Sequence, residues 1–149
     1  MKVLSTEINI ATPPERVWQV LTDFSNYEAW NPFIRRIEGK AEIGEVVKFT
    51  IRLPDRKLTL DCLISEMIPN QKICWKWHLF FDRFDCGDHS LILRPHGGNR
   101  VHIDHRVIYN RWLLGLAEHL TGNQIKRGFV DMNKALKSYC ERVASEQAA

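Results

Sequence analysis

Apolar and polar residues alternate along the first part of the chain. Between residues 4 and 10 every even position is apolar or threonine, and the odd positions between them are Ser5, Glu7 and Asn9. A repeat of two residues is typical of a strand that buries one face. The pattern therefore predicts a first strand that ends before residue 12.

Two short helices are predicted directly after this strand. Thr12 is expected to cap the first helix, with Pro13 in its first position and Glu15 three residues after the cap. Apolar residues then follow at helical spacing as far as Phe24. The capping pattern is repeated from Ser25 onward, which predicts a second short helix that ends at residues 30–32.

The period of two returns between residues 33 and 109. Turn-forming residues interrupt it at position 39 and at positions 54–55, 69–70, 82–88 and 97–98. This spacing predicts about six strands in an antiparallel meander. One face of these strands is consistently apolar and the other is polar, so we expect one side of the sheet to face water.

The last third of the chain has the spacing of a helix. Apolar residues recur at helical intervals from 112 to 143, with an interruption at 121–123 that predicts a kink or a brief break. The apolar stripe of this helix and the apolar face of the sheet must cover each other. The predicted fold class is therefore α+β, with a curved antiparallel sheet of about seven strands around one long C-terminal helix, and a space between them that suits a ligand.

Composition and charge narrow the possible partners. The 149 residues, 44% of them hydrophobic and 26% charged, fit one soluble domain over residues 1–149. The net charge of +3 is scattered, and the densest basic run, at residues 35–40, is typical of a solvated strand edge, so nucleic acid is not an expected partner. No stretch has the pattern of a signal peptide or a membrane span, which predicts a cytoplasmic protein without integral membrane association. The pattern predicts no particular oligomeric state.

Four segments together resemble one known family. They are TPPERVW at residues 12–18, DFSNYEAWNP at 23–32, HSLILRP at 89–95 and GFVDMNKALKSYCE at 128–141. Over nearly its whole length the chain resembles the START-like (SRPBCC) superfamily, whose fold is called the helix grip, and in particular its polyketide cyclase/dehydrase-like branch. The resemblance implies a hydrophobic pocket more firmly than a reaction, because the superfamily includes enzymes, lipid carriers and receptors. The chain departs from the family at Ile103, His105 and Tyr109, where a histidine, a carboxylate and a glycine are common.

Two histidines on the apolar face are the main candidates for chemistry. If residues 96–98 form a hairpin turn, His89 and His105 become cross-strand neighbours that point inward. They could orient a ligand or act as a general acid and base, because imidazole titrates near neutral pH. The alternative is a pair of core histidines bonded to the backbone or to Tyr109. Asn133 on the closing helix could hydrogen-bond into the same space.

No metal site and no cofactor is predicted. Near the two histidines the only further inward ligand is Cys62, on a more distant strand. The four cysteines lack CxxC spacing. The sequence also has no nucleophile elbow, zinc-protease motif, phosphate loop or inward pair of carboxylates. The chain therefore carries no catalytic signature, and whether it is an enzyme stays open, with His89 and His105 as the catalytic candidates.

The wall of the expected pocket is mostly apolar and aromatic. We expect ligand contacts from Trp30, Phe49, Ile51, Leu60, Cys62, Trp77, His89, Ile103, His105, Tyr109, Leu116, Leu120, Phe129, Met132, Asn133 and Leu136.

Three functions are compatible with this pattern. The first hypothesis is that the protein binds a small hydrophobic or aromatic molecule, such as a lipid, a polyketide or a quinone, between the sheet and the helix. The second is a polyketide cyclase or dehydratase with a pocket histidine as the proton-transfer group, whose rate titrates between roughly pH 5 and 8. The third is a partner-binding protein with a packed interior and an exposed apolar patch elsewhere.

Overall fold

The structure is a computed structural model that describes residues 2–79, 84–110 and 123–148. Its elements are, in chain order, β1 (Lys2–Ile10), α1 (Pro14–Thr22), the 3-10 turn η1 (Phe24–Asn26), α2 (Tyr27–Trp30), β2 (Ile34–Glu38), β3 (Val46–Arg52), β4 (Lys57–Ile68), β5 (Lys72–Leu79), β6 (Phe84–Pro95), β7 (Val101–Tyr109) and α4 (Gln124–Ala148). The predicted break at 121–123 and the helical stretch before it lie mostly outside the described residues.

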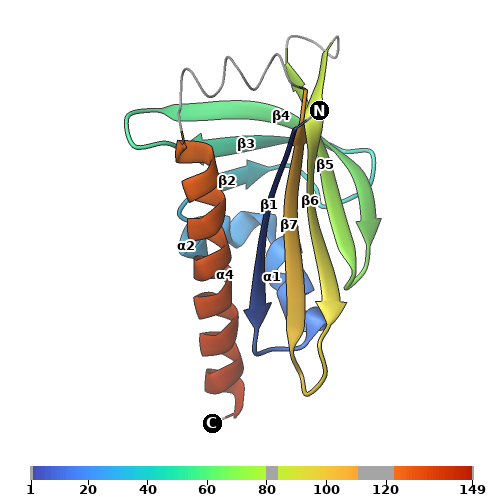
Figure 1. Cartoon of the computed structure of the whole chain (residues 1–149), viewed down its shortest axis with the longest axis vertical. Coiled ribbons are helices and arrows are strands. Elements are labelled where there is room, and N and C mark those ends of the chain that lie inside the picture. The colour runs from blue at the N-terminus through green and yellow to red at the C-terminus, as the bar shows by residue number, and fades with distance from the viewer. Residues whose placement is uncertain (1, 80–83, 111–122, 149) are drawn as a thin grey trace.

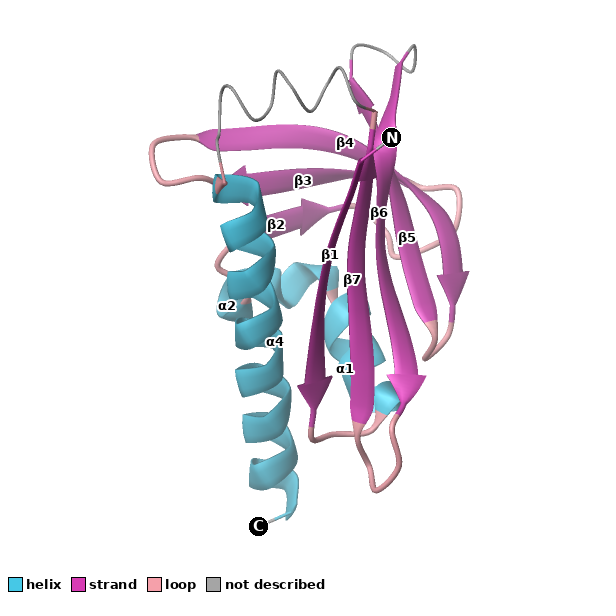
Figure 2. Cartoon of the chain, in the orientation of Figure 1, coloured by secondary structure: helices cyan, strands magenta, loops and turns pink. Residues whose placement is uncertain are grey.

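The seven strands form one antiparallel sheet in the order β1-β7-β6-β5-β4-β3-β2. In Figure 1 the strands β2 to β4 run across the view while β1, β6 and β7 run down it, so the sheet is strongly curved. Helix α4 contacts β1, and it also contacts α1 and α2. Figure 2 shows this division into one sheet and one long helix. The predicted fold class, with two short helices after the first strand, is confirmed.

The β6–β7 hairpin turns where the glycines predict it. Gly97, Gly98 and Asn99 have φ values of 70°, 54° and 56°, a region that glycine and asparagine tolerate best. The resulting register pairs His89 with Val107 and Leu91 with His105. The two histidines are thus diagonal cross-strand neighbours on the inner face.

A β-bulge shapes the sheet beside these histidines. Between β5 and β6 the register shifts after Trp77, which lies opposite Gly87. Gly87 has φ 144°, and a Cβ at this position would lie 1.9 Å from the carbonyl oxygen of Ile108. Only glycine at this position lets β6 and β7 approach this closely. The bulge between β5 and β6 also increases the local twist of the strand.

Both predicted helix caps are wrong. Helix α1 begins one residue later than expected, because the carbonyl of Pro13 accepts from the N–H of Arg16 at 3.1 Å, and Pro13 is the cap residue. The hydroxyl of Thr12 is buried without a hydrogen-bond partner. Ser25 lies inside η1, and its hydroxyl donates to Asp23 at 2.9 Å instead of capping α2.

One hydrophobic cluster lies between the inner face of the sheet and the helices. The predicted inward alternation on β3, β5 and β7 places Phe49, Trp75 and Ile103 at 0% exposure. The inner face of α4 adds Phe129, Met132 and other apolar residues to the same cluster. Within the described residues, none of the helices combines the length and the apolar composition needed to span a bilayer.

Helix α4 docks closely at Gly128. A Cβ at this position would lie 2.2 Å from the ring of Phe33, which packs edge-on against Phe129 at 5.2 Å between ring centroids. Phe33 is itself only 3% exposed, so its ring has little room to move. The absence of a side chain at residue 128 therefore sets how near α4 approaches the segment before β2.

Gly128→Ala is expected to destabilise the protein. The methyl group must displace the buried Phe33 ring, which costs about 1–3 kcal/mol, against a gain of about 1 kcal/mol in helix propensity. Chemical denaturation should show a net loss of unfolding free energy. Lys134→Ala, on the exposed face of the same helix, should change it by less than about 0.5 kcal/mol. A Gly128→Ala variant as stable as the wild type would contradict this docking.

Candidate functional site

The centre of the candidate site is a pair of buried histidines. His89 on β6 is 0% exposed and His105 on β7 is 2% exposed. Their Nε2 atoms lie 2.6 Å apart, and the planes of the two rings differ by 13°. Two imidazole nitrogens at this distance form a hydrogen bond in which one carries the proton and the other accepts it. The pair joins the two strands across the inner face of the sheet.

Two further residues extend this pair into a hydrogen-bond chain. The Nδ1 atom of His105 lies 2.7 Å from Oδ1 of Asn133 on α4. The Nδ2 of Asn133 donates to the hydroxyl of Thr6 on β1 at 2.9 Å. Register pairs Thr6 directly with His105. We call the sequence Thr6–Asn133–His105–His89 the polar chain; it links α4 to three neighbouring strands.

Aromatic rings surround the histidine end of the polar chain. The ring centroid of His89 lies 5.1 Å from that of Trp75, 5.8 Å from that of Trp77 and 5.1 Å from that of Phe129. Phe129 also contacts His105 at 4.7 Å, edge to face. Tyr109 packs against Trp77 at 6.0 Å. This wall excludes water and lowers the local dielectric.

Three polar atoms in this wall have no hydrogen-bond partner among the residues that the structure describes. They are Nδ1 of His89 and the indole Nε1 atoms of Trp75 and Trp77, all of them buried. Leaving a buried polar group unpaired costs about 1–3 kcal/mol, and most buried polar groups in folded proteins are paired. Three such atoms around one ring therefore mark a place where a ligand could supply the missing partners.

Burial keeps both histidines neutral at pH 7. Loss of solvation lowers the pKa of His105 from 6.5 to about 4, and the hydrogen bond to Asn133 opposes this only in part. Loss of solvation, and then repulsion from His105, lower the pKa of His89 well below its ordinary value. Burial also raises the pKa of Tyr109, so its phenol stays protonated. The described part of the site is thus uncharged.

The structure brings most of the predicted pocket residues into one cluster. Those buried in the hydrophobic cluster are Trp30, Phe49, Ile51, Cys62, Trp77, Ile103, Tyr109, Phe129, Met132 and Leu136, and Leu60 packs against it half-buried. Trp30 lies apart from the histidines, beside Tyr27 and Tyr139. Leu116 and Leu120 lie outside the described residues. Ligand contact by any of these residues stays a prediction.

The hydrogen-bond partners predicted for His89 and His105 differ from those in the structure. Among the described residues neither ring bonds to the backbone or to Tyr109; His105 bonds to Asn133, which was expected only to reach into the space. Thr6 was missed, although a hydroxyl on the apolar face of a strand is a signal for a buried partner. Trp75 is not among the expected ligand contacts, yet its indole is one of the unpaired groups.

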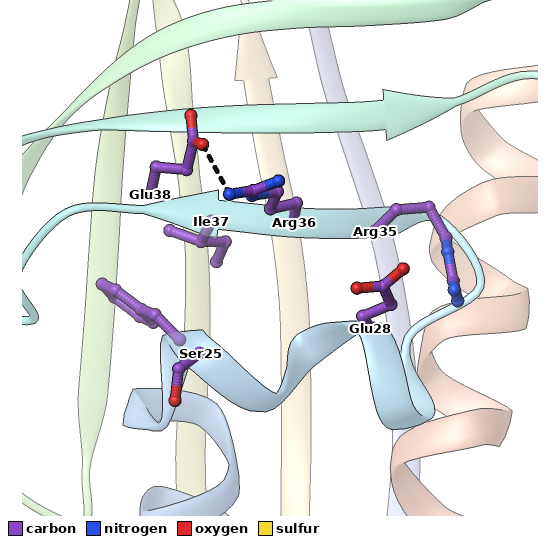
Figure 3. Close-up of a pocket in the computed structure, with 7 residues that line it drawn as sticks. Ser25, Glu28, Arg35, Arg36, Ile37 and Glu38 are labelled. Atoms are coloured by element: carbon purple, nitrogen blue, oxygen red, sulfur yellow. Dashed lines mark ion pairs between the residues drawn. The ribbon is translucent and has the colours of Figure 1, made fainter.

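Two open grooves follow the edge strand β2. One has a volume of about 390 Å³ and is lined by Phe24, Ser25, Glu28, Arg35, Arg36, Ile37 and Glu38 (Figure 3). Arg36 forms an ion pair with Glu38 at 3.0 Å, and Arg35 donates to the carbonyl of Asn31 at 2.9 Å. Both guanidinium groups thus have local partners. This supports the expected solvated edge for the basic run.

One group of potential metal ligands lies on the outer face of the sheet. His102 Nε2 is 3.4 Å from a carboxylate oxygen of Glu7 and 3.4 Å from one of Asp104. Asp104 is already paired with Arg94 at 2.6 Å, and Asn9 lies 2.6 Å from the other nitrogen of His102. We interpret the group as a surface ion-pair network, since its charges are balanced locally.

The curved sheet, the long helix across its inner face and the buried polar chain between them define a helix-grip protein. The sequence matches the family described as "Polyketide cyclase / dehydrase and lipid transport" over residues 1–141, and the chain belongs to this family. No curated protein matches the sequence.

Solved structures share the fold at low sequence identity. The Zhui aromatase/cyclase from a Streptomyces species is 16% identical, with a TM-score of 0.73 over 95% of this chain and 94% of its own. A START superfamily protein from Mycobacterium smegmatis is 15% identical, with a TM-score of 0.70 over 95% and 98%. A protein from Mesorhizobium loti is 22% identical, with a TM-score of 0.66 over 91% and 96%. At these identities the likeness shows the fold alone.

The buried histidines should make stability depend on pH. In the unfolded chain His105 takes up a proton near pH 6.5, but in the folded protein only near pH 4. Unfolding therefore takes up protons between these values, and the free energy of unfolding should fall as the pH falls from about 6.5 to 4. His105→Gln should reduce this slope by about 1.4 kcal/mol per pH unit, the value for one proton.

Urea denaturation at several pH values measures this slope. Lys134→Gln, on the exposed face of α4, is the matched control and should keep the wild-type slope. Equal slopes in the wild type and His105→Gln would show that His105 is not held neutral by burial.

Proposed function

We propose that the protein binds a small hydrophobic or aromatic molecule between the inner face of the sheet and α4, next to His89. The observation that carries this proposal is that His89, Trp75 and Trp77 each have an unpaired buried polar atom and that both indole rings contact the ring of His89. Family membership supports it, because the family description includes lipid transport. Cytoplasmic location and the absence of a nucleic-acid partner belong to the same proposal.

Burial of apolar surface would supply most of the affinity. Each Å² of apolar surface removed from water contributes about 25 cal/mol. The aromatic rings around His89 and the inner face of α4, with Phe129 and Met132, present such surface. The few polar atoms would then fix the orientation of the ligand, as is usual in sites of this kind.

A polyketide cyclase or dehydratase is the second candidate. It is favoured by the neutral histidine pair, because an imidazole with a free nitrogen can accept a proton. The family description and the Zhui aromatase/cyclase are compatible with it. The lowered pKa values move the expected titration of such an activity from pH 5–8 to about pH 4 for His105, and in the same direction for His89. A rate that changes tenfold per unit between pH 6 and 8 would contradict a role for these histidines.

A partner-binding function has less support. It requires a contiguous exposed apolar patch. The large apolar side chains that are exposed among the described residues are Val3, Ile43, Val46 and Ile68. Val3 on β1 and Ile68 on β4 are separated in the sheet by β7, β6 and β5. Val3 and Ile68 therefore do not belong to one contiguous patch on neighbouring strands.

Met132→Gln is the sharpest test of the ligand site. Met132 is 0% exposed on the inner face of α4, and glutamine has nearly the same size but adds a buried amide. We expect it to weaken binding of the uncharged fluorescent aromatic probe N-phenyl-1-naphthylamine at least tenfold in a fluorescence titration. Lys134→Gln, two residues along on the exposed face, should bind as the wild type does.

Native mass spectrometry of the freshly purified protein provides an independent test. A hydrophobic molecule that is released on denaturation would support the proposal and identify the ligand class. A protein that carries nothing, and whose probe binding is equal in Met132→Gln and Lys134→Gln, would contradict it. Circular dichroism of each variant establishes that the fold is retained.

A further inference from the structure

The polar chain has a defined direction, which fixes where each histidine carries its proton. Asn133 donates with Nδ2 to Thr6, so its Oδ1 faces His105 and can only accept. A neutral His105 must then hold its proton on Nδ1 in order to donate to Asn133. Its Nε2 is consequently a lone-pair acceptor.

The same reasoning applies to His89, the next residue of the polar chain. Since Nε2 of His105 can only accept, the 2.6 Å contact requires His89 to donate from its own Nε2. A neutral imidazole carries one proton, so Nδ1 of His89 is a bare acceptor. This atom is buried and has no partner. A side chain on α4 and a hydroxyl on β1 thus determine the state of an atom on β6.

We propose that Nδ1 of His89 accepts a hydrogen bond from a hydroxyl group of the ligand, so that the protein selects phenols, enols or alcohols on an apolar skeleton over the same skeleton without a donor. This inference rests on the proposed function and names the ligand class of that site. A buried site built to accept a hydrogen bond discriminates against an analogue that cannot donate one, because the acceptor is then left unpaired.

The two indole groups extend the same chemistry. Trp75 and Trp77 each contact the ring of His89 and each has an unpaired N–H. A hydroxyl group donates one hydrogen bond and accepts up to two, so its oxygen can receive an indole N–H while its proton goes to His89. An ether or a halogen substituent lacks the donor. A carboxylate would enter an interior without a positive charge among the described residues of the polar chain and wall, at a large cost in solvation.

The protonation states can be measured without any ligand. In protein labelled with ¹⁵N-histidine, long-range ¹H–¹⁵N spectra at pH 7 distinguish protonated from unprotonated ring nitrogens. We expect His105 as the Nδ1–H form and His89 as the Nε2–H form, each assigned by its loss in His105→Gln or His89→Phe. His89 protonated on Nδ1 at pH 7 would overturn the inference, because that nitrogen would be a donor.

Ligand selection is tested with two matched probes, 2-naphthol and 2-methoxynaphthalene. They share the aromatic skeleton, and only the first can donate a hydrogen bond. Calorimetric titration of the wild type should show 2-naphthol binding at least tenfold more tightly. His89→Phe keeps an aromatic ring but removes the acceptor, and should bind both probes within about twofold of each other. His96→Phe, in the exposed β6–β7 turn, is the matched control and should keep the wild-type preference.

Asn133→Leu provides a second variant if His89→Phe does not fold. Leucine has a similar size but cannot accept from His105, so the direction of the chain is no longer imposed and the preference for 2-naphthol should fall. Equal binding of both probes by the wild type would overturn the inference while the proposed apolar site stands. If neither probe binds, the proposed function fails for molecules of this size and the inference fails with it.

Discussion

The polar chain Thr6–Asn133–His105–His89 is the constraint on which the arrangement of the interior depends. Its members come from β1, α4, β7 and β6, and the two contacts of Asn133 join residues 127 and 28 positions apart in the sequence. His89, His105 and Asn133 are buried, and an unpaired polar group in the interior costs about 1–3 kcal/mol. The chain therefore specifies one position of α4 against the sheet, whereas hydrophobic contact alone would tolerate several.

Backbone features on both sides of this chain make its geometry possible. The left-handed residues of the β6–β7 turn set the parity that sends His89 and His105 to the same face. Gly87 lets β6 approach β7 closely at a bulge next to Trp77, and Gly128 lets α4 approach the Phe33 ring. Two positions without a side chain thus bring the aromatic wall and the helix close enough to enclose the histidines.

Much of this arrangement can be predicted from the sequence because it depends on local periodicity. Alternation along each strand and the glycines at 97–98 were enough to place His89 and His105 inward and close together. The apolar stripe of the last helix placed Asn133 near the same space. The signals in the strands act within one strand or one hairpin. Once the register of the hairpin is fixed, the face to which each side chain points is fixed as well.

What could not be predicted depends on how separate elements dock. Thr6 contacts Asn133 only because α4 crosses β1. The periodicity of the sequence within each element does not predict where the two elements cross. The first predicted cap failed for a local reason. Pro14 restricts the residue before it to an extended backbone, so Pro13, with ψ 152°, takes the cap position and Thr12 falls outside the helix. The buried indole of Trp30 packs beside Tyr139, at a distance from the histidines. The order of residues in α2 does not predict this position.

The electrostatics of the site bear on the choice between binding and catalysis. A general acid or base works best when its pKa is near the working pH. A pKa of about 4 for His105, and a lowered one for His89, leaves both rings neutral at pH 7 and makes them weak proton acceptors. The same neutrality suits hydrogen bonding, because an uncharged acceptor can stay buried when no ligand is present. The lowered pKa values therefore favour the proposed recognition of an uncharged polar group on an apolar molecule over the proposed removal of a proton from it.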